Sequence, residues 1–414
     1  MLFSNLLMRW LGPVCFHACE CSCGGGGAVD RVVAPQDGEY IVLSATMAVL
    51  KKYGSAQDAI SAALADMPKG GTLTLLSGCY AIEKPIELVS HVTLRGMGRG
   101  TRLGVKGEFG IYAKNADGGR VENLTLVAKD DNAQCGVHFE GVGDSQVVDV
   151  FVKGFAKAGI FFTENCFLCE IRGAKTCGNK QSGIWLNRQT GNGNGRGGKF
   201  VPTIVTNCIS YADQIGYKTT EAMVVNFVAC AAYQPVTRGW HIFGISNSVL
   251  LSGCRTFQCG SEAVYVENSH EINISSSIFC WHRGDGIVLD NARWGLVSAC
   301  NIIDSGVRDK QGKFTTGLVM KNGCMGLQIS SNAVFNWGDQ CPMLYGITED
   351  ESCADNSITQ NNINYYTEQG VASKGKDTLV KDNKQVGPAA YLSMGKPPYP
   401  DFDMAKIEAF MTNQ

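Results

Sequence analysis

Four carboxylates in the second half of the chain recur at one interval, because the spacing from Glu262 to Asp285 equals that from Glu267 to Asp290. If this spacing corresponds to one structural repeat, Glu262 lies next to Asp285, and Glu267 next to Asp290, on neighbouring repeats. Two carboxyl groups held close together cannot both ionise freely, so one keeps a proton and acts as an acid beside a base or nucleophile. Glycosidic bonds are cleaved by such pairs. We rank Glu262 and Asp285 first as catalytic residues, and Glu267 and Asp290 second.

Three residues shortly before Asp285 add further chemistry, because Trp281 offers an aromatic plane, His282 a proton carrier and Arg283 a cation. Histidine is the side chain most readily poised near neutral pH, and arginine binds carboxylate or sulfate groups through two parallel hydrogen bonds. We therefore include these three among the predicted substrate-binding residues. The alternative interpretation is a turn that local hydrogen bonds hold together.

The interval belongs to an internal repeat whose units begin Gly-apolar-x-apolar. The units start, at nearly regular spacing, at Gly136, Gly159, Gly183, Gly216, Gly239, Ala263, Gly286, Gly317 and Gly346. Each unit is too small to bury its own apolar face and can do so only by stacking on its neighbours. We predict an all-β fold, a right-handed parallel β-helix of roughly ten coils. A leucine-rich repeat has a comparable period, but its Leu and Asn spacing is absent.

Side chains alternate between the two faces of a strand, so the repeat also predicts which residues face solvent. Positions one and three after the Gly are mostly apolar and point inward, as in Ile287 and Leu289. The outward positions form two rows along the solenoid, one with His138, Phe161, Trp185, Lys218, His241 and Tyr265, the other with Glu140, Thr163, Asn187, Thr220, Phe243, Glu267, Asp290, Lys321 and Asp350. Arg238, Glu262 and Asp285 form a third stack just before the strands.

Aromatic planes suit sugar rings, and polar side chains suit hydroxyl groups. The exposed strand face is therefore predicted to bind a saccharide. The substrate-binding residues that we predict are Arg238, His241, Tyr265, His282, Arg283, Trp281, Lys218, Trp185 and Lys321. The alternative interpretation is a solvent-facing strand surface that is merely polar with occasional aromatics.

The chain divides into four predicted segments. One amphipathic pattern, over residues 55–67, predicts a helix that caps the first coil. The segments are a leader or flexible N-terminus at 1–40, the capping helix and first coils at 41–105, the β-helix at 106–386, and a tail at 387–414 in which residues 403–411 could form a helix. Longer intervals between repeats predict loops at 191–199, 307–316 and 336–345. The first contains G-x-G-x-x-G, but without a following helix it is not a dinucleotide site.

Eighteen cysteines would suggest disulfides or metal until their spacing is considered. Six of them recur at a nearly constant interval inside apolar segments: Cys208, Cys230, Cys254, Cys280, Cys300 and Cys324. We interpret these as stacked, buried free thiols, with paired disulfides as the alternative. The N-terminal Cys15, His17, Cys19, Cys21 and Cys23 lack the spacing of structural zinc sites. Asp130-Asp131 and Glu349-Asp350-Glu351 resemble calcium ligands, but solvated loops are the favoured interpretation. We predict no metal and no cofactor.

The charge balance bears on partners. Lys and Arg number 36 and Asp and Glu 38, giving a net charge of −2 without long basic runs. Nucleic acid and anionic membranes are held by massed Lys and Arg, so neither is expected as a partner. The apolar start of the chain lacks a clean basic region and cleavage site, so export is undecided, and we favour a secreted or virion-associated protein.

The stretch DAISAALADMPKGGTLTLLSGCYAIEKPIELVSHVTLRGMGRGTRL resembles the opening of the pectate-lyase-like superfamily, and with the repeats the resemblance spans about residues 50–385. Members include polygalacturonases, pectate lyases, inulin fructotransferases, uronate epimerases and phage tailspikes. The resemblance implies the β-helix and, for most members, action on polysaccharides. In polygalacturonases catalytic aspartates stand just before the strand, where Asp285 and Glu262 stand in this chain. None of the polygalacturonase motifs is intact in this sequence.

We therefore predict a carbohydrate-active enzyme that cleaves or rearranges glycosidic bonds of an oligo- or polysaccharide bound along the exposed strand face. One alternative is a polysaccharide lyase or intramolecular fructotransferase, in which water is not the acceptor. Another is a non-catalytic glycan-binding adhesin or virion spike. We also predict a homotrimer whose seams contain Phe161, Trp185 and Phe243.

Overall fold

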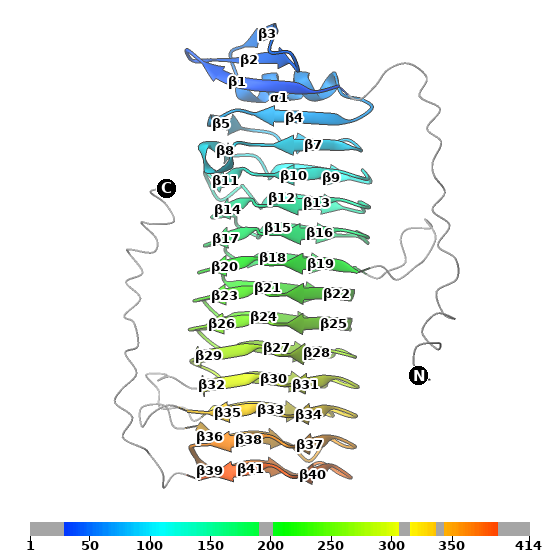
Figure 1. Cartoon of the computed structure of the whole chain (residues 1–414), viewed down its shortest axis with the longest axis vertical. Helices are drawn as coiled ribbons and strands as arrows, with labels where there is room; N and C mark the ends of the chain where they lie inside the picture. Colours follow the sequence, from blue (N-terminus) through cyan, green and yellow to red (C-terminus); the bar gives the residue numbers. More distant parts are fainter. Residues whose placement is uncertain (1–28, 190–201, 306–314, 337–342, 388–414) are drawn as a thin grey trace, which may run out of the picture.

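The computed structural model describes residues 29–189, 202–305, 315–336 and 343–387. Over these residues the chain winds into a right-handed parallel β-helix, a tall stack of coils (Figure 1). Three sheets, which we name A, B and C, run along the stack, and from β4 onward successive strands of the chain belong to A, B and C in turn. The predicted all-β solenoid is thus confirmed. Sheet C has 12 strands, so the solenoid has about twelve coils, close to the ten predicted.

The strands are short, and from β4 onward each pairs in parallel with the equivalent strand one coil away. Sheet A contains β1 Arg31–Gln36, β2 Glu39–Ser44, β3 Val49–Tyr53, β4 Gly71–Leu75, β7 Val92–Arg95, β10 Arg120–Glu122, β13 Gln146–Val148, β16 Glu170–Arg172, β19 Thr203–Thr206, β22 Met223–Val228, β25 Asn247–Ser252, β28 Asn273–Ser275, β31 Leu296–Ser298, β34 Gln328–Ser330, β37 Ser357–Thr359 and β40 Leu379–Lys381.

The other two sheets have the same stacking. Sheet B contains β5 Gly78–Ile82, β8 Thr101–Val105, β11 Thr125–Ala128, β14 Phe151–Lys153, β17 Lys175–Cys177, β20 Ile209–Tyr211, β23 Ala231–Tyr233, β26 Arg255–Phe257, β29 Ile278–His282, β32 Asn301–Ser305, β35 Ala333–Phe335, β38 Asn362–Asn364 and β41 Lys384–Val386. Sheet C contains β6 Ile86–Glu87, β9 Phe109–Lys114, β12 Cys135–Glu140, β15 Ala158–Thr163, β18 Ser182–Asn187, β21 Ile215–Thr220, β24 Arg238–Phe243, β27 Val264–Glu267, β30 Ile287–Asp290, β33 Thr315–Lys321, β36 Met343–Glu349 and β39 Tyr366–Ser373.

The N-terminal end of the solenoid differs from the rest, because β1, β2 and β3 pair antiparallel there while β1 also pairs in parallel with β4. Helix α1, Ala56–Ala65, starts at the side-chain cap of Ser55 and packs its Ile60 side into the core beside these strands (Figure 1). Because β1 begins at Arg31, the fold starts within the segment predicted as a leader. Residues 1–28 of that predicted leader lie outside the described residues.

Just before β30, the neighbouring coil leaves no room for a side chain at Gly286. A Cβ on Gly286 would lie 2.4 Å from the carbonyl oxygen of Gly317 on the next coil and 2.4 Å from Ile302 Cγ2. Such contacts are far below van der Waals distance. The repeated Gly of the sequence therefore marks a close approach of successive coils, and Ala263, the smallest side chain, holds the same position on one coil.

A ladder of small buried residues lines the turn from sheet A to sheet B. Cys208, Cys230, Cys254 and Cys300 occupy it, and each accepts or donates backbone hydrogen bonds in the same way on successive coils. Two predicted members lie elsewhere: Cys280 is within β29, and Cys324 follows β33. The 13 cysteines in the described part of the chain are free thiols, as predicted.

The same ladder changes composition toward the C-terminal end. Its positions there hold Asn332, Asn361 and Asn383, whose side-chain amides bond one to the next along the axis. Asn361 Nδ2 also donates to the carbonyl oxygen of Ile329 at 2.9 Å, while its Oδ1 accepts the backbone N–H of Asn332 at 3.0 Å. Buried amides are stable only when their donors and acceptors are satisfied, and this ladder satisfies them.

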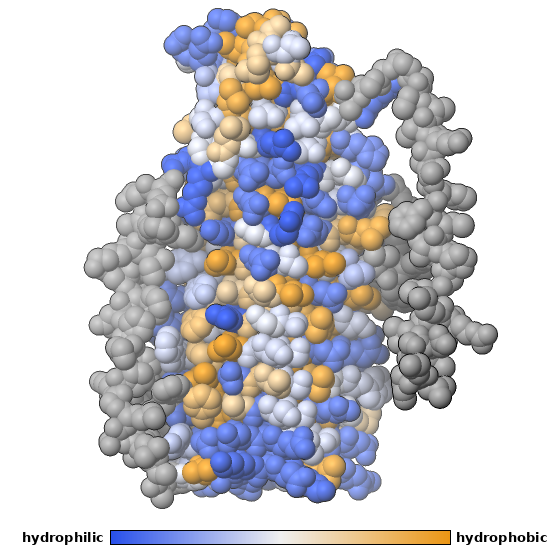
Figure 2. Space-filling model, viewed as in Figure 1, coloured by the Kyte–Doolittle hydropathy of each residue, from blue (hydrophilic) through white to orange (hydrophobic). Residues whose placement is uncertain are grey.

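The surface is mixed in character. Figure 2 shows hydrophilic and hydrophobic residues interspersed along the stack, with hydrophilic residues gathered at its C-terminal end. None of the helices in the described ranges is long and apolar enough to cross a membrane. The predicted loop at 191–199, most of those at 307–316 and 336–345, and the predicted helix at 403–411 lie outside the described residues.

Candidate active site

The outer face of sheet C carries the predicted rows of side chains. The register pairs Trp185 with Lys218, Lys218 with His241, and His241 with Tyr265. In the second row Glu267 pairs with Asp290 and Asp290 with Lys321. The inward positions are buried, with Ile287 and Leu289 at most 3% exposed. The period-two pattern of the sequence therefore assigned the two faces of this sheet correctly.

Tyr265 and Asp290 form the centre of a polar cluster on this face. The Tyr265 hydroxyl donates to Asp290 Oδ2 at 2.6 Å, Lys321 Nζ lies 3.2 Å from the same oxygen, and Asn322 Nδ2 donates to Oδ1 at 2.8 Å. Burial alone would raise the pKa of Asp290, but these contacts outweigh it and the pKa lies below its usual value. Burial and the hydrogen bond to Asp290 raise the pKa of Tyr265. The cluster thus holds a protonated phenol against an ionised carboxylate.

Arg238 joins the cluster from the preceding coil. Its guanidinium carbon lies 4.1 Å from the centre of the Tyr265 ring, and its Nε donates to Glu262 Oε2 at 2.8 Å. Burial alone would raise the pKa of Glu262, but the hydrogen bond and charge of Arg238 lower it below the usual value. Glu262 is therefore an ionised group tied to a cation.

His241 is the neutral member of the cluster. Its ring stacks on Phe243 at 4.4 Å between centroids and meets the Tyr265 ring edge-on at 5.6 Å. Burial, followed by the charges of Arg238 and Lys218, lowers the pKa of His241 to about 4. The imidazole is thus unprotonated near neutral pH, with its Nε2 3.7 Å from Glu267 Oε2. The half-exposed Glu267 borders the cluster. We call Arg238, His241, Glu262, Tyr265, Glu267, Asp290 and Lys321 the sheet C cluster.

Aromatic rings and lysines continue the face toward the N-terminal end. Lys218 Nζ lies 3.6 Å from the Trp185 ring centre and 5.4 Å from that of Phe243. Lys157 Nζ lies 3.9 Å from the Phe161 ring and 5.3 Å from the Trp185 ring. Phe161 was predicted to lie at a subunit seam. It is only 4% exposed, so its ring packs within its own chain and offers little surface to another subunit.

The predicted pair of Glu262 and Asp285 occupies equivalent pre-strand positions on consecutive coils, because Val264 is in register with Ile287. Their contacts point in opposite directions along the axis. Glu262 binds Arg238 on the coil before, whereas Asp285 Oδ1 accepts the backbone N–H of Thr316 on the coil after at 2.7 Å. The second pair, Glu267 and Asp290, is in direct register but makes its contacts to His241 and to Tyr265.

The turn before Asp285 differs from its prediction. His282 ends β29 with its side chain inside the solenoid, fully buried, and its Nε2 lies 3.2 Å from Thr256 Oγ1. Burial lowers the pKa of His282 to about 3. A side chain without exposed surface does not contact a saccharide, so the predicted role of His282 is wrong. Trp281 lies at the end of sheet B, where its Nε1 donates to Asp304 Oδ2 at 3.0 Å, and Arg283 is exposed in the turn.

Sequence reasoning missed two functional candidates. Lys157 precedes β15 and reaches over the outward rings, and Asn322 follows β33 and holds Asp290. Both stand just outside the strands, where the alternation of faces gives no signal. Among the described residues, no group of three or more His, Cys, Asp or Glu could hold a metal ion. Glu349, considered as a calcium ligand, is buried and accepts hydrogen bonds from Asn356 and Thr378.

Comparison of the sequence finds no match among protein-family models or curated proteins. The structure is similar to that of the A-module of the Azotobacter vinelandii mannuronan C-5 epimerase AlgE6, with a TM-score of 0.63 and 16% identity over 83% of this chain and 94% of that one. It is also similar to the catalytic unit of a Streptomyces thermodiastaticus GH87 α-1,3-glucanase, with a TM-score of 0.57 and 12% identity over 83% and 69%. The Dettilon tailspike protein gives 0.55 and 14% over 77% and 67%.

These neighbours include both polysaccharide-acting enzymes and a phage tailspike, and at such low identity they establish the fold alone. Each is a β-helix protein of the kind that the sequence resemblance predicted. The chain is therefore a right-handed parallel β-helix, the fold that the sequence resemblance implied.

Proposed function

We propose that the protein is an enzyme that binds an acidic polysaccharide along the outer face of sheet C and eliminates across the glycosidic bond of a uronate unit at the sheet C cluster. The observation that carries this proposal is the arrangement around Tyr265. A protonated phenol, a neutral imidazole and two cations, from Arg238 and Lys321, lie together on one exposed strand face.

The unpaired cations of the face favour an acidic substrate. Lys157 and Lys218 sit over aromatic rings and, in the described part of the chain, neither forms an ion pair with a carboxylate. Burial and the charge of Lys157 lower the pKa of Lys218, so the two ammonium groups repel each other. A uronate carboxylate between them relieves this repulsion, while Trp185 offers a plane to the sugar ring.

Elimination needs a base for the proton at C5, which is acidic because C5 bears the carboxylate. His241 is neutral and takes this proton, and the electron pair forms a C4–C5 double bond. The C4–O4 bond breaks, and the leaving oxygen takes the proton of the Tyr265 hydroxyl. Arg238 and Lys321 neutralise the charge that develops on the uronate carboxylate. No water is consumed in this step.

Hydrolysis by a carboxylic acid pair is the second candidate. It requires that one carboxyl group of the pair stays protonated. Arg238 keeps Glu262 ionised, and Tyr265 and Lys321 keep Asp290 ionised, so the acid of each predicted pair would have to be its other member, Asp285 or Glu267. Burial raises the pKa of Asp213 to about 6, but this carboxyl group lies inside the solenoid among Thr176, Asn179 and Ser210, away from a bound saccharide.

Two of the structural neighbours support action on polysaccharides. One is named a mannuronan C-5 epimerase, whose reaction centre is the carbon from which elimination also removes a proton, and the other is named an α-1,3-glucanase. Removal of the C5 proton followed by its return from the opposite side gives epimerisation instead of cleavage. The tailspike among the neighbours agrees with the glycan-binding alternative.

The proposal is tested by incubating the full chain with polymannuronate, polygalacturonate, inulin and α-1,3-glucan. We expect unsaturated oligosaccharides from a uronate polymer, seen as ultraviolet absorbance and as products whose mass contains no added water. Products with added water would instead identify a hydrolase. Deuterium incorporated at C5 in heavy water without chain shortening would identify an epimerase, and binding without any product would identify a glycan-binding protein.

The predicted homotrimer stays a prediction. A trimer that closed over sheet C would hide the cluster from a polymer, so the proposed function requires that subunits associate through another face. Light scattering measures the mass in solution, and a single chain mass at micromolar concentration would exclude the trimer.

A further inference from the structure

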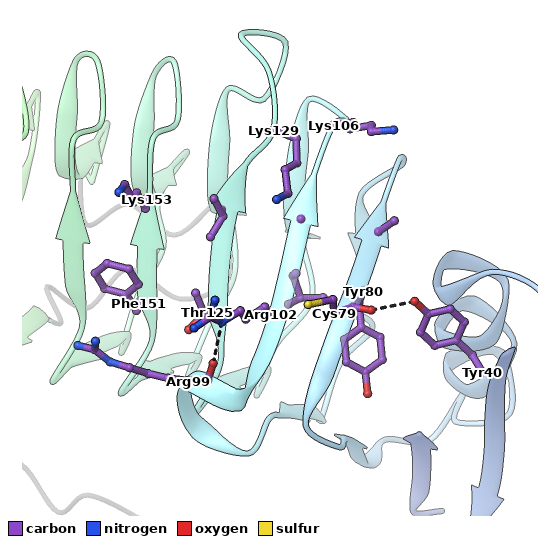
Figure 3. A pocket seen from close by; sticks show the side chains of 14 residues that line it. Tyr40, Cys79, Tyr80, Arg99, Arg102, Lys106, Thr125, Lys129, Phe151 and Lys153 are labelled. Atoms are coloured by element: carbon purple, nitrogen blue, oxygen red, sulfur yellow. Dashed lines mark hydrogen bonds between the residues drawn. The ribbon is translucent and has the colours of Figure 1, made fainter. Parts of the chain in front are cut away.

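A second candidate site, which is concave, lies on sheet B, near the N-terminal end of the solenoid and away from the sheet C cluster. It is a pocket of about 600 Å³ over β5, β8, β11 and β14, with Tyr40 from β2 at one end and Phe151 at the other (Figure 3). This volume lies in the ~300–1,000 Å³ range of ligand sites in proteins. We call it the sheet B pocket.

The pocket exists because small residues follow one another on its floor. Ala81, Gly104 and Val127 occupy the same outward position on three successive coils. At Gly104 a Cβ would meet Lys129 Cε at 2.6 Å, so the lysine stem crosses the space that a side chain would otherwise fill. The hydroxyl of Tyr40 donates to the carbonyl oxygen of Cys79 at 2.8 Å and fixes the wall at that end (Figure 3).

The lining is strongly cationic. Five of the 14 lining residues are basic and none is acidic: Arg99, Arg102, Lys106, Lys129 and Lys153. The whole chain, by contrast, has a net charge of −2. Lys106 lies 4.0 Å from Glu83, with both side chains exposed. Across the described residues the other four basic groups form no ion pair with an Asp or Glu.

Polar atoms in the pocket also lack partners. Arg99 Nη1 and Thr125 Oγ1 are buried and have no hydrogen-bond partner in the described structure. The whole Thr125 residue is only 5% exposed. Arg102 Nε donates to the carbonyl oxygen of Arg99 at 3.3 Å, which leaves the rest of its guanidinium free to bind a ligand (Figure 3). Buried donors without acceptors are costly, and a charged acceptor in the pocket would satisfy them.

We infer that the sheet B pocket binds a short anionic saccharide segment, whose carboxylate or sulfate groups contact Arg99, Arg102, Lys129 and Lys153. The basic groups come from successive coils, which are spaced at ~4.8 Å, so they match a ligand that presents a negative group on consecutive units. The side chain of Val127 offers apolar contact to a sugar, and the buried ring of Phe151 carries the Arg99 guanidinium, whose carbon lies 5.2 Å from the ring centre. This inference does not rest on catalysis at sheet C.

Cys79 gives a direct readout, because its exposed thiol lines the pocket whereas the other described cysteines are buried. The full chain is treated with N-ethylmaleimide, and modification of the Cys79 peptide is measured by mass spectrometry. A tetramer of galacturonate or a sulfated oligosaccharide is expected to slow modification by at least about fivefold, and a neutral glucan oligomer of equal length to leave it unchanged.

Three outcomes would overturn the inference. They are no protection by either anionic saccharide, equal protection by the neutral oligomer, and equal protection by inorganic sulfate or phosphate, which would leave an anion site without saccharide recognition. Protection by a single-stranded oligonucleotide alone would likewise reject a saccharide in favour of nucleic acid.

Variants locate the binding. Arg102→Gln combined with Lys129→Gln should weaken saccharide binding, measured by calorimetry, by roughly tenfold or more. Gly104→Leu should fill the pocket without removing a charge, and should abolish protection even if the double variant proves unstable. The matched control is Lys175→Gln, which removes an exposed cation from the same sheet outside the pocket. An equal loss of saccharide affinity in the control would show that binding depends only on the overall positive charge, and it would reject the sheet B pocket as a specific site.

The sheet B and sheet C sites are separable. Tyr265→Phe should leave protection of Cys79 unchanged, whereas Gly104→Leu should leave turnover of a short uronate oligomer unchanged. Protection without turnover on any glycan would support the sheet B pocket while rejecting the proposed enzyme.

Discussion

Tyr265 on β27 donates a 2.6 Å hydrogen bond to Asp290 on β30, so the phenol of one coil and the carboxylate of the next behave as one unit. Because the pKa of Asp290 is lowered and that of Tyr265 is raised, the shared proton stays on the phenol. The same face contains a similar pair nearer its N-terminal end, where Tyr112 donates to Glu140 at 2.7 Å. Within the described residues that earlier pair has no Arg over its tyrosine ring, and it provides a matched control.

The first prediction concerns the phenol. Tyr265→Phe should lower kcat by roughly 10²–10⁴-fold, because it removes the group that protonates the leaving oxygen. The fold should persist, since the ring still packs against Arg238 and His241. Steady-state turnover and circular dichroism check both statements. Tyr112→Phe should retain nearly full turnover, and equal losses in the two variants would contradict the proposed location of the site.

The second prediction separates the two carboxylate pairs. Asp290→Asn should reduce turnover at least tenfold, since it disturbs Tyr265 and Lys321 together. Asp285→Asn should reduce turnover less than tenfold, because Asp285 caps the backbone of Thr316 outside the cluster. Initial rates of the two variants, compared once both are shown to have the same thermal stability, tell which of the two carboxylates turnover depends on more. The reverse order would restore Glu262 and Asp285 as the catalytic pair.

The third prediction is a pH profile. His241 acts as a base only when neutral, so kcat/KM should fall as the pH drops through about 4, the pKa that burial imposes. The positive charge of Lys218 also lowers this pKa, so Lys218→Gln should move the acidic limb to higher pH. Rates measured across the acidic and neutral range test the shift. A limb that stays in place in this variant would remove His241 from the role of base.

The fourth prediction concerns His138, which lies among Phe109, Tyr112 and Phe161 with neither ring nitrogen hydrogen-bonded in the described structure. Burial lowers its pKa to about 4, below the ~6.5 of an unfolded histidine. Between these pH values the unfolded state binds more protons than the folded state. The folded state therefore has its full stability, as far as His138 is concerned, above pH ~6.5 and loses stability as the pH falls toward 4. His138→Phe should therefore flatten the dependence of stability on pH.

At neutral pH His138→Phe should also raise the free energy of unfolding by about 1 kcal/mol, because it removes two unsatisfied buried nitrogens. Thermal unfolding at neutral and at mildly acidic pH measures both effects. If the free energy of unfolding of this variant varied with pH as it does in the wild type, His138 would not be a significant source of the pH dependence of stability.

The fifth prediction concerns the ladder between sheets A and B. Asn361→Ala leaves the backbone N–H and side-chain amide of Asn332 without their acceptor, so it should cost about 2–4 kcal/mol. Cys254→Ser should cost about 1 kcal/mol or less, since Ser277 already occupies the next position of the same ladder and caps the backbone N–H of Cys254. Chemical denaturation measures the free energy of unfolding of both variants. Similar losses would show that the asparagine positions stabilise the fold no more than the cysteine positions do.

The sequence predicted sheet C well because the alternation of side chains and the repeat of Gly both come from local backbone geometry. Glu267 and Asp290 were placed in register from spacing alone, and the structure agrees. His282 was misplaced because it ends a sheet B strand, and the repeat was aligned only on sheet C, so its inward direction could not be deduced. Which cation holds each carboxylate was also hidden, because such contacts depend on side-chain conformation between coils.

The sheet B pocket was wholly unforeseen. Its floor depends on Ala81, Gly104 and Val127 lying side by side, although each belongs to a different coil and they are far apart in the sequence. A small residue in one strand predicts nothing, and a hollow forms only where neighbouring coils repeat it. Recognition of such a site from sequence would require alignment of the sheet B strands, which are short and carry no invariant Gly.

From β9 to β30 the strands of sheet C pair in a constant register, so each coil in this part of the solenoid advances the chain by one fixed step of ~4.8 Å. The distance between the sheet B pocket and the sheet C cluster can therefore change only in whole coils. Duplication or loss of a single coil between them would alter the length of polymer that spans both sites by one fixed step, while each site kept its own geometry intact.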